Sequence, residues 1–333
     1  MIPSRHMARH SQTEAIQQAI EVQELAPPSS GLLSSLRHWR HWRHWRQRAL
    51  IPYLFLLPFL LLFSFFILVP LLYALWTSFF IERLIGGTTF VGLQNYQEVL
   101  HDGNFWEGVR NVLLLLFTQV PLMLGLALGL ALLLDSQIVR FKTIFRLGYF
   151  LPYAIPSVIG ALLWGYLYSA HIGPFAQLAE LLHWPPPPFL TAAGLLPSIA
   201  NILTWQWTGY NMVILYAALQ AIPPELYDAA RVDGASGWEI ARHIKIPLIA
   251  PAIVLTVVFS IIGTLQLFNE PQIMTAIVPN LIQDHYTPNL YAYNLAFTNQ
   301  QYNYAAAVSF VLGAVVFVFS YVFMLVTYRR GQR

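Results

Sequence analysis

The sequence predicts an all-α membrane protein with six transmembrane helices and both termini in the cytoplasm. Three observations lead to this fold class: the composition, six long apolar stretches, and the uneven distribution of Lys and Arg. Hydrophobic residue types make up 57% of the 333 residues and charged types only 10%, and the mean hydropathy is +0.55. Because soluble domains carry about 25% charged residues, this composition excludes an ordinary soluble enzyme and a disordered scaffold.

Six stretches contain the roughly 20 apolar residues that a helix needs to cross the hydrocarbon layer of a bilayer. The first and third stretches contain several prolines, so we expect a kink or tilt in the first and an irregular start in the third. The fourth is the least hydrophobic, because amide side chains interrupt it. The stretches are residues 51–80, 111–134, 144–169, 195–219, 248–269 and 305–328.

Lys and Arg collect on one side of these stretches, which predicts the orientation of the chain. Sixteen of the 18 basic residues lie in the two terminal tails, in the loops before the third and fifth stretches or, for Arg146, at the near edge of the third stretch. The other two, Arg83 and Arg110, both lie in the loop after the first stretch. Because cytoplasmic loops carry the excess of Lys and Arg, we expect a multi-pass protein of the cell membrane with cytoplasmic termini.

Residues 1–50 are predicted to form a basic cytoplasmic tail, since the apolar run starts too late and is too long for a cleavable signal peptide. Residues 38–46 repeat the tripeptide His-Trp-Arg three times. On a helix, the Trp, Arg and His side chains would form separate stripes that suit the lipid headgroups. We favour a low-complexity anchor. Metal binding by the three histidines is disfavoured, because their spacing differs from that of a zinc helix.

The chain offers no constellation of residues for catalysis. Its only two lysines, Lys142 and Lys245, belong to no glycine-rich phosphate loop, and it has no cysteine. The predicted spans are nearly empty of ionisable residues, which an intramembrane enzyme or a proton-coupled carrier requires. Glu270, at the outer end of the fifth stretch, is the residue that comes closest to meeting this requirement. We therefore expect no metal or cofactor in this chain, no nucleic-acid partner, and energy supplied by another subunit.

The cytoplasmic segment 220–247 is the most informative part of the chain. Pro224 suits the first turn of a helix, and Gly234 suits the left-handed position after its end. Ser236 and Glu239 have the spacing of a capping box that opens a second helix. These signals predict a helix–turn–helix hairpin. A small apolar face at helical spacing would let another chain hold the hairpin in a groove, and it consists of Leu226, Ala229 and Ala230.

Three elements follow one another at a defined spacing in this hairpin: Asp228-Ala229-Ala230, then Gly234, then Ile244-x-Ile246-Pro247. This order closely resembles the signature loop of permease subunits of binding-protein-dependent ABC importers. The family has Glu where this chain has Asp228, and Leu where it has Ile246. Other segments resemble the carbohydrate permeases, above all the first permease of the maltose and glycerol-phosphate type; these are residues 90–96, 105–111, 145–152, 268–271 and 304–307.

The resemblance implies a domain of six spanning helices over residues 51–330 that has no ATPase site of its own. It implies that a cytoplasmic ATPase subunit, which binds ATP and Mg, holds the hairpin in a cleft. A second homologous permease subunit, an extracytoplasmic substrate-binding protein and membrane lipid would be the other partners. Residues 274–279 replace the family's usual glycine-rich stretch. The ATPase-coupling residues would be Asp228, Ala229, Ala230, Asp233, Gly234 and Ala235.

Polar side chains inside the fourth and fifth stretches are candidates for contact with a transported solute. Amides, hydroxyls and aromatic faces suit a neutral sugar or polyol. Such residues also join helices to one another in membranes, Trp207 would also suit the membrane interface, and Glu270 would suit a structural pair or a helix cap. The candidate substrate-binding residues are Gln206, Trp207, Tyr210, Asn211, Gln266 and Asn269.

Two other functions compete with the transport subunit of an ATP-driven importer. An ion-coupled secondary transporter of a polar solute would need intramembrane carboxylates and gives no reason for the hairpin. A lipid-modifying membrane enzyme would need a catalytic constellation, which the sequence lacks.

The loop over residues 271–304 is rich in Tyr, Asn and Gln and contains no basic residue. It suits either contact with a binding protein or packing at the membrane interface.

Overall fold

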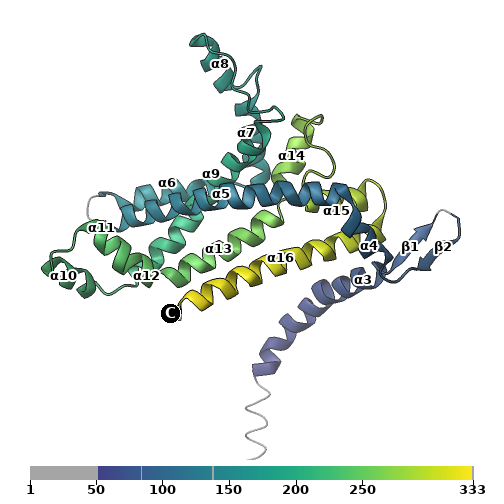
Figure 1. Cartoon of the computed structure of the whole chain (residues 1–333), viewed down its shortest axis with the longest axis horizontal. Coiled ribbons are helices and arrows are strands. Elements are labelled where there is room, and N and C mark those ends of the chain that lie inside the picture. The colour runs from purple at the N-terminus through teal and green to yellow at the C-terminus, as the bar shows by residue number, and fades with distance from the viewer. Residues whose placement is uncertain (1–51, 84, 137–138, 332–333) are drawn as a thin grey trace, which may run out of the picture. The chain divides into compact units, whose positions relative to one another are not determined.

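A computed structural model describes residues 52–83, 85–136 and 139–331 of the chain, and helices dominate them (Figure 1). The chain divides into two compact units, Met1–Pro70 and Leu71–Arg333. The predicted basic tail over residues 1–50, with its His-Trp-Arg repeat, lies outside the described residues. The domain boundaries expected from the sequence stay predictions.

The first predicted span is helical over Pro52–Thr77 and contains a π-helical turn, η1 (Ser64–Leu68), before α3 (Val69–Thr77). A π turn inserts an extra residue into the helix, which is one way to produce the irregularity expected there. Two short strands follow, β1 (Phe80–Arg83) and β2 (Gly87–Phe90), which pair antiparallel with Phe80 opposite Phe90. This β-hairpin was not predicted from the sequence, which indicated an all-α chain.

The longest helix, α5 (Gly103–Asp135), follows the short α4 (Gln94–His101). Asp102 caps α5, because its carboxylate accepts a hydrogen bond of 2.9 Å from the Asn104 N–H. Helix α5 lies along α9 (Leu195–Gln220), and the two bury an apolar face between them. Figure 1 shows them side by side. They form the core of the second unit.

Two helices of the second unit are interrupted, and both interruptions lie beside the core helices. The chain bends by 94° between α6 (Lys142–Ala154) and α7 (Ser157–Tyr168), at Ile155 and Pro156. This bend matches the irregular start expected for the third span. Residues 266–268 separate α13 (Ala250–Leu265) from α14 (Asn269–Ile277).

Two short helices of the predicted outer loops and one helix that contains the sixth predicted span remain. These are α8 (Pro174–Leu181), α15 (Pro288–Phe297) and α16 (Tyr302–Gly331). The carboxylate of Asp102 accepts hydrogen bonds from the hydroxyls of Tyr291, at 2.6 Å, and Tyr304, at 2.9 Å. One carboxylate therefore ties the start of α5 to both α15 and α16.

Four helices of the described part of the chain are long and apolar enough to cross a membrane, or five when the bent pair α6–α7 is taken as one span. The fourth predicted span forms a continuous 26-residue helix, α9, but its amide and hydroxyl side chains leave it outside that set. The count of six spans and the cytoplasmic position of the termini therefore stay predictions.

Candidate functional site

The predicted helix–turn–helix hairpin is present and has the expected local geometry. Its first helix is α10 (Glu225–Val232), and Gly234 follows with a φ of 85°. The N–H of Ala235 donates to the Ala230 carbonyl at 2.9 Å, and the N–H of Gly234 donates to the Arg231 carbonyl at 3.1 Å. This pair of bonds is the Schellman ending of a helix, which requires a residue in the left-handed region.

The second helix of the hairpin, α11 (Gly237–Ile240), opens with the predicted capping box. The Ser236 N–H donates to the Glu239 carboxylate at 2.7 Å, and the Glu239 N–H donates to the Ser236 hydroxyl at 3.3 Å. The hydrogen bond from the Ser236 N–H, and secondarily the Ser236 hydroxyl, hold the pKa of the Glu239 carboxylate below its usual range. A π-helical turn, η2 (Ala241–Lys245), and a short α12 (Ile246–Leu248) follow. The fifth span then begins at Ala250 in α13, two residues after the start of the predicted stretch 248–269.

The hairpin presents an exposed surface. Val232 is 88% exposed, Trp238 67% and Leu226 45%. The six predicted coupling residues lie on this surface, where Asp228, Ala229, Asp233 and Gly234 are exposed and Ala230 and Ala235 are half-buried. Exposed apolar side chains next to small residues are typical of a protein–protein contact.

Polar contacts fix the hairpin to the ends of the two core helices. The ammonium of Lys245 contacts the carboxylate of Asp135 at the end of α5, and both side chains are largely buried. The Gln220 amide, at the end of α9, donates to the same carboxylate at 2.7 Å. The Lys245 ammonium also lies 4.9 Å from the centre of the Tyr227 ring. Burial, and secondarily the charge of Asp135, raise the pKa of Tyr227.

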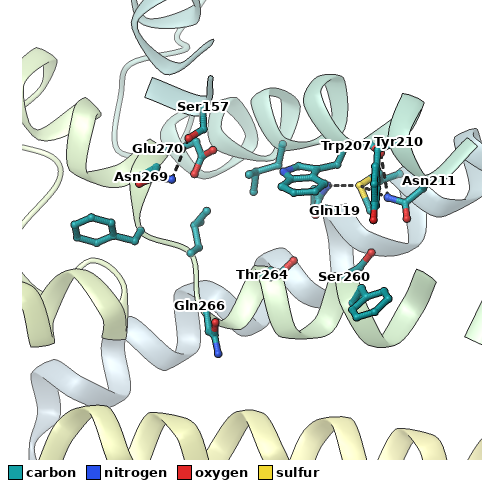
Figure 2. A pocket seen from close by; sticks show the side chains of 16 residues that line it. Gln119, Ser157, Trp207, Tyr210, Asn211, Ser260, Thr264, Gln266, Asn269 and Glu270 are labelled. Carbon is teal, nitrogen blue, oxygen red and sulfur yellow. Dashed lines mark hydrogen bonds between the residues drawn. The ribbon is translucent and has the colours of Figure 1, made fainter. Parts of the chain in front are cut away.

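A pocket of about 220 Å³ lies between α5, α9, α13 and the two interrupted helices. In Figure 2, Ser157, Asn269 and Glu270 gather at one end of the pocket, and Trp207, Tyr210 and Asn211 lie at the other. Its polar lining consists of Gln119, Ser157, Trp207, Tyr210, Asn211, Ser260, Thr264, Gln266, Asn269 and Glu270.

The pocket lies where the two interrupted helices meet. The Asn269 amide, at the start of α14, donates a hydrogen bond of 3.0 Å to the Ser157 hydroxyl at the start of α7. In transporters, such breaks in spanning helices are tolerated where the freed backbone lines a cavity. Both breaks therefore lie beside the same cavity.

Five of the six predicted substrate-binding residues line this pocket: Trp207, Tyr210, Asn211, Gln266 and Asn269. Gln206 does not line it. Its side chain is buried and donates a hydrogen bond of 3.3 Å to the Ile155 carbonyl at the bend between α6 and α7. Gln206 thus satisfies a backbone group that the bend leaves free, which is the helix-joining role weighed for these residues.

Trp207 and Tyr210 form an aromatic wall of the pocket, and Tyr153 packs against both of them without lining the pocket. The rings of Tyr153 and Tyr210 stack with their centres 4.5 Å apart, and Trp207 meets both edge-on at 5.3 Å and 5.7 Å. Trp207 remains 39% exposed. Its ring therefore presents a partly free surface, of the kind that packs on the C–H groups of a sugar.

Five polar lining residues were not among the predicted set. Gln119 comes from α5, Ser157 from α7, and both Ser260 and Thr264 from α13, whereas Glu270 was given a structural role. Gln119 is the one amide in the middle of its apolar stretch, which is a signal that the sequence did contain. Within residues 52–83, 85–136 and 139–331, no cluster of three or more His, Asp or Glu side chains could hold a metal ion.

Comparison with known proteins identifies the family of this chain. Residues 127–333 match the family described as binding-protein-dependent transport system inner membrane component. The chain is 33% identical to the lactose transport system permease protein LacF of Rhizobium radiobacter, over 81% of this chain and 91% of that protein. It is 29% identical to the trehalose/maltose transport system permease protein MalF of Thermococcus litoralis, over 84% of this chain and 94% of the relative.

A solved structure shares the fold. It is that of a bacterial ABC transporter involved in the import of the acidic polysaccharide alginate, with a TM-score of 0.75 and 21% identity. The likeness covers 86% of this chain and 99% of that chain. At this identity it concerns the fold alone. The family match and the relatives establish that the chain belongs to the binding-protein-dependent transport system inner membrane components.

Proposed function

We propose that the chain is the transmembrane subunit of an ATP-driven importer and forms the translocation pathway for a sugar or a related polyol. The observation that carries this proposal is the pocket between two interrupted helices, lined by amides, hydroxyls and an aromatic wall. Family membership adds the dependence on a binding protein. The relatives named for lactose and for trehalose and maltose support a saccharide as the solute.

The exposed hairpin is the contact through which the chain receives energy. A cytoplasmic ATPase subunit, which binds ATP and Mg, holds α10 and the turn at Gly234. The contacts of Lys245 with Asp135, and of Asp135 with Gln220, carry the motion of the hairpin to α5 and α9. Both helices line the pocket, so movement of the hairpin changes which side of the membrane the pocket faces.

The proposed partners follow from this division of work. A second homologous permease subunit completes the pathway, and an extracytoplasmic binding protein delivers the saccharide. On its predicted outer side, the chain presents to the binding protein a polar hollow of about 430 Å³, whose lining includes Asn111 and Gln283. There the Glu107 carboxylate lies 3.3 Å from the His285 ring nitrogen.

The test is the ATPase activity of the purified assembly in lipid, measured across a panel of mono- and oligosaccharides with candidate binding proteins. We expect at least one loaded binding protein to stimulate hydrolysis, and vanadate to block uptake of its saccharide. Uptake that is insensitive to vanadate and driven by an ion gradient would contradict the proposal in favour of an ion-coupled carrier.

A further inference from the structure

The pocket contains one carboxylate and no cationic side chain. Glu270, in the first turn of α14, is 4% exposed and lines the pocket. None of the other lining residues is a Lys, Arg or His. In the described part of the chain, no side-chain nitrogen of Lys, Arg or His lies within 4.0 Å of this carboxylate. The three ion pairs in that part of the chain involve other residues. The electrostatic character of the pocket is therefore set by Glu270.

The surroundings of Glu270 leave its carboxylate available to a ligand. The neighbouring Asn269 amide is engaged with the Ser157 hydroxyl. Within the described residues, no hydrogen bond joins the Glu270 carboxylate to another side chain. A carboxylate accepts hydrogen bonds at about four positions, so most of this capacity is unused. In Figure 2, Glu270 lies at the end of the pocket opposite the aromatic wall.

Simple electrostatics decides which saccharides this arrangement favours. A buried carboxylate without a cation needs hydrogen-bond donors to replace lost water. Two neighbouring hydroxyls of a sugar supply such donors, and charge-assisted hydrogen bonds are the stronger kind. A carboxylate or phosphate on the sugar would instead place a second negative charge near the first in a site of low dielectric.

We propose that Glu270 is a specificity-determining residue that accepts hydrogen bonds from the hydroxyls of a neutral saccharide and excludes saccharides bearing carboxylate or phosphate groups. This inference rests on the proposed function, since it concerns the solute held in the same pocket. It separates this chain from the solved alginate importer, whose substrate is an acidic polysaccharide although the fold is shared.

A purely structural role for Glu270 has a different signature. A negative charge in the first turn stabilises a helix, because it lies near the positive end of the helix dipole. Loss of that contribution would lower the stability of the assembly and reduce its affinity for all ligands by the same factor. Loss of a specificity-determining carboxylate instead changes the ratio between the affinities for acidic and neutral ligands. The ratio is therefore the quantity to measure.

The experiment uses the full assembly in lipid nanodiscs without its binding protein, so that discrimination between saccharides depends on the pocket alone. Isothermal titration calorimetry compares three pairs of β-1,4-linked disaccharides, built from glucose, galactose or mannose and from the corresponding uronic acids. We expect at least one neutral disaccharide to bind about tenfold or more tightly than its uronate partner. Glu270→Gln should bring this ratio close to one by improving the affinity for the uronate.

Two further variants complete the test. Glu180→Gln removes an exposed carboxylate of α8, outside the pocket, and should leave the ratio unchanged. If Glu270→Gln fails to assemble, Ser260→Lys adds a cation to the pocket lining and should improve binding of the uronate. Equal affinities of the wild-type assembly for both members of a bound pair, or an unchanged ratio in Glu270→Gln, would overturn the inference alone. Failure of all six disaccharides to bind would contradict the proposed function as well.

Discussion

The ammonium of Lys245, at the end of the hairpin, contacts the carboxylate of Asp135, the last residue of α5. The two residues are 110 positions apart, and their side chains are 14% and 6% exposed. Gln220 from α9 donates to the same carboxylate at 2.7 Å. One buried carboxylate therefore links the hairpin to both core helices, and both helices reach the pocket.

Breaking this ion pair should uncouple transport from ATP hydrolysis. Lys245→Met leaves the Asp135 carboxylate buried with one donor, which should cost about 2 kcal/mol of stability. We expect saccharide uptake to fall at least about tenfold per ATP hydrolysed, a change of 1.4 kcal/mol in coupling. Uptake and hydrolysis measured on the same proteoliposomes give this ratio.

The charge exchange Asp135→Lys with Lys245→Asp serves as the matched control. It restores an ion pair between the same elements and should recover part of the coupling. A second control, Arg231→Gln, removes the exposed pair with Asp228, at 3.1 Å, which contributes little in water. Wild-type uptake per ATP in Lys245→Met would show that this contact does not transmit the motion.

The turn of the hairpin depends on Gly234. Its φ of 85° is unfavourable for residues with a side chain, although nothing lies within 4 Å of an added Cβ. Gly234→Ala should therefore cost only the backbone strain, about 1 kcal/mol, and Gly234→Asn less. Gly234→Pro cannot adopt this φ and should abolish coupled uptake while the assembly retains ATP hydrolysis.

A bulky residue on the hairpin tests whether the ATPase subunit packs closely against it. Ala230 is half-buried on the small face of α10, so Ala230→Trp should prevent close approach of the ATPase subunit. We expect loss of ATPase copurification with the permease pair. Ala230→Ser, a small replacement, should leave copurification intact. Full uptake by Ala230→Trp would contradict the docking role.

The close contact between α6 and α9 depends on Gly209. A Cβ at this position would lie 1.7 Å from the Tyr149 carbonyl oxygen, which belongs to the backbone and cannot move alone. Gly209→Ala should separate the two helices and lower the thermal stability of the assembly by several degrees. Gly129→Ala is the matched control, since nothing lies within 4 Å of its added Cβ. Equal melting temperatures of the two variants would contradict the packing of α6 on α9.

The phenol of Tyr286 should titrate far above the usual range. Burial raises its pKa to about 12. A raised pKa in the folded state means that the folded protein holds this proton longer. Its contribution to stability is therefore present below pH 10 and is lost as pH rises from 10 to about 12.

The difference in phenolate absorbance between the wild type and Tyr286→Phe measures this titration directly. Its midpoint should lie near pH 12. Tyr302→Phe removes a phenol at an exposed position and serves as the control variant. A midpoint near pH 10 for the Tyr286 difference would show that this phenol is open to water.

The sequence predicted the hairpin in detail because its signals are local. The capping box joins Ser236 to Glu239, and the helix end requires only Gly234 and its neighbours. Lys245 and Asp135 carry no such signal, because their contact depends on how α5 packs against the rest of the second unit. No pattern within either segment pointed to the other.

The pocket was predicted in part for a similar reason. Trp207, Tyr210 and Asn211 interrupt an apolar stretch, which identifies them in sequence. Ser157 gains its position from the bend of 94° before α7, and the direction of that bend is set by packing against α14. The β-hairpin was missed because strands of four residues carry too little pattern to be read.

The central claim is that an ATPase subunit grips the hairpin, and site-specific photocrosslinking tests it most directly. The chain has no cysteine, so Val232→Cys creates a single attachment point for a benzophenone maleimide. Ile85→Cys, at the exposed position between the β strands, is the control on the predicted outer side. We predict that the Val232 probe crosslinks to the ATPase subunit in a yield that changes with ATP and vanadate, and that the Ile85 probe does not. An assembled transporter in which the Val232 probe reacts only with lipid or solvent would contradict the account.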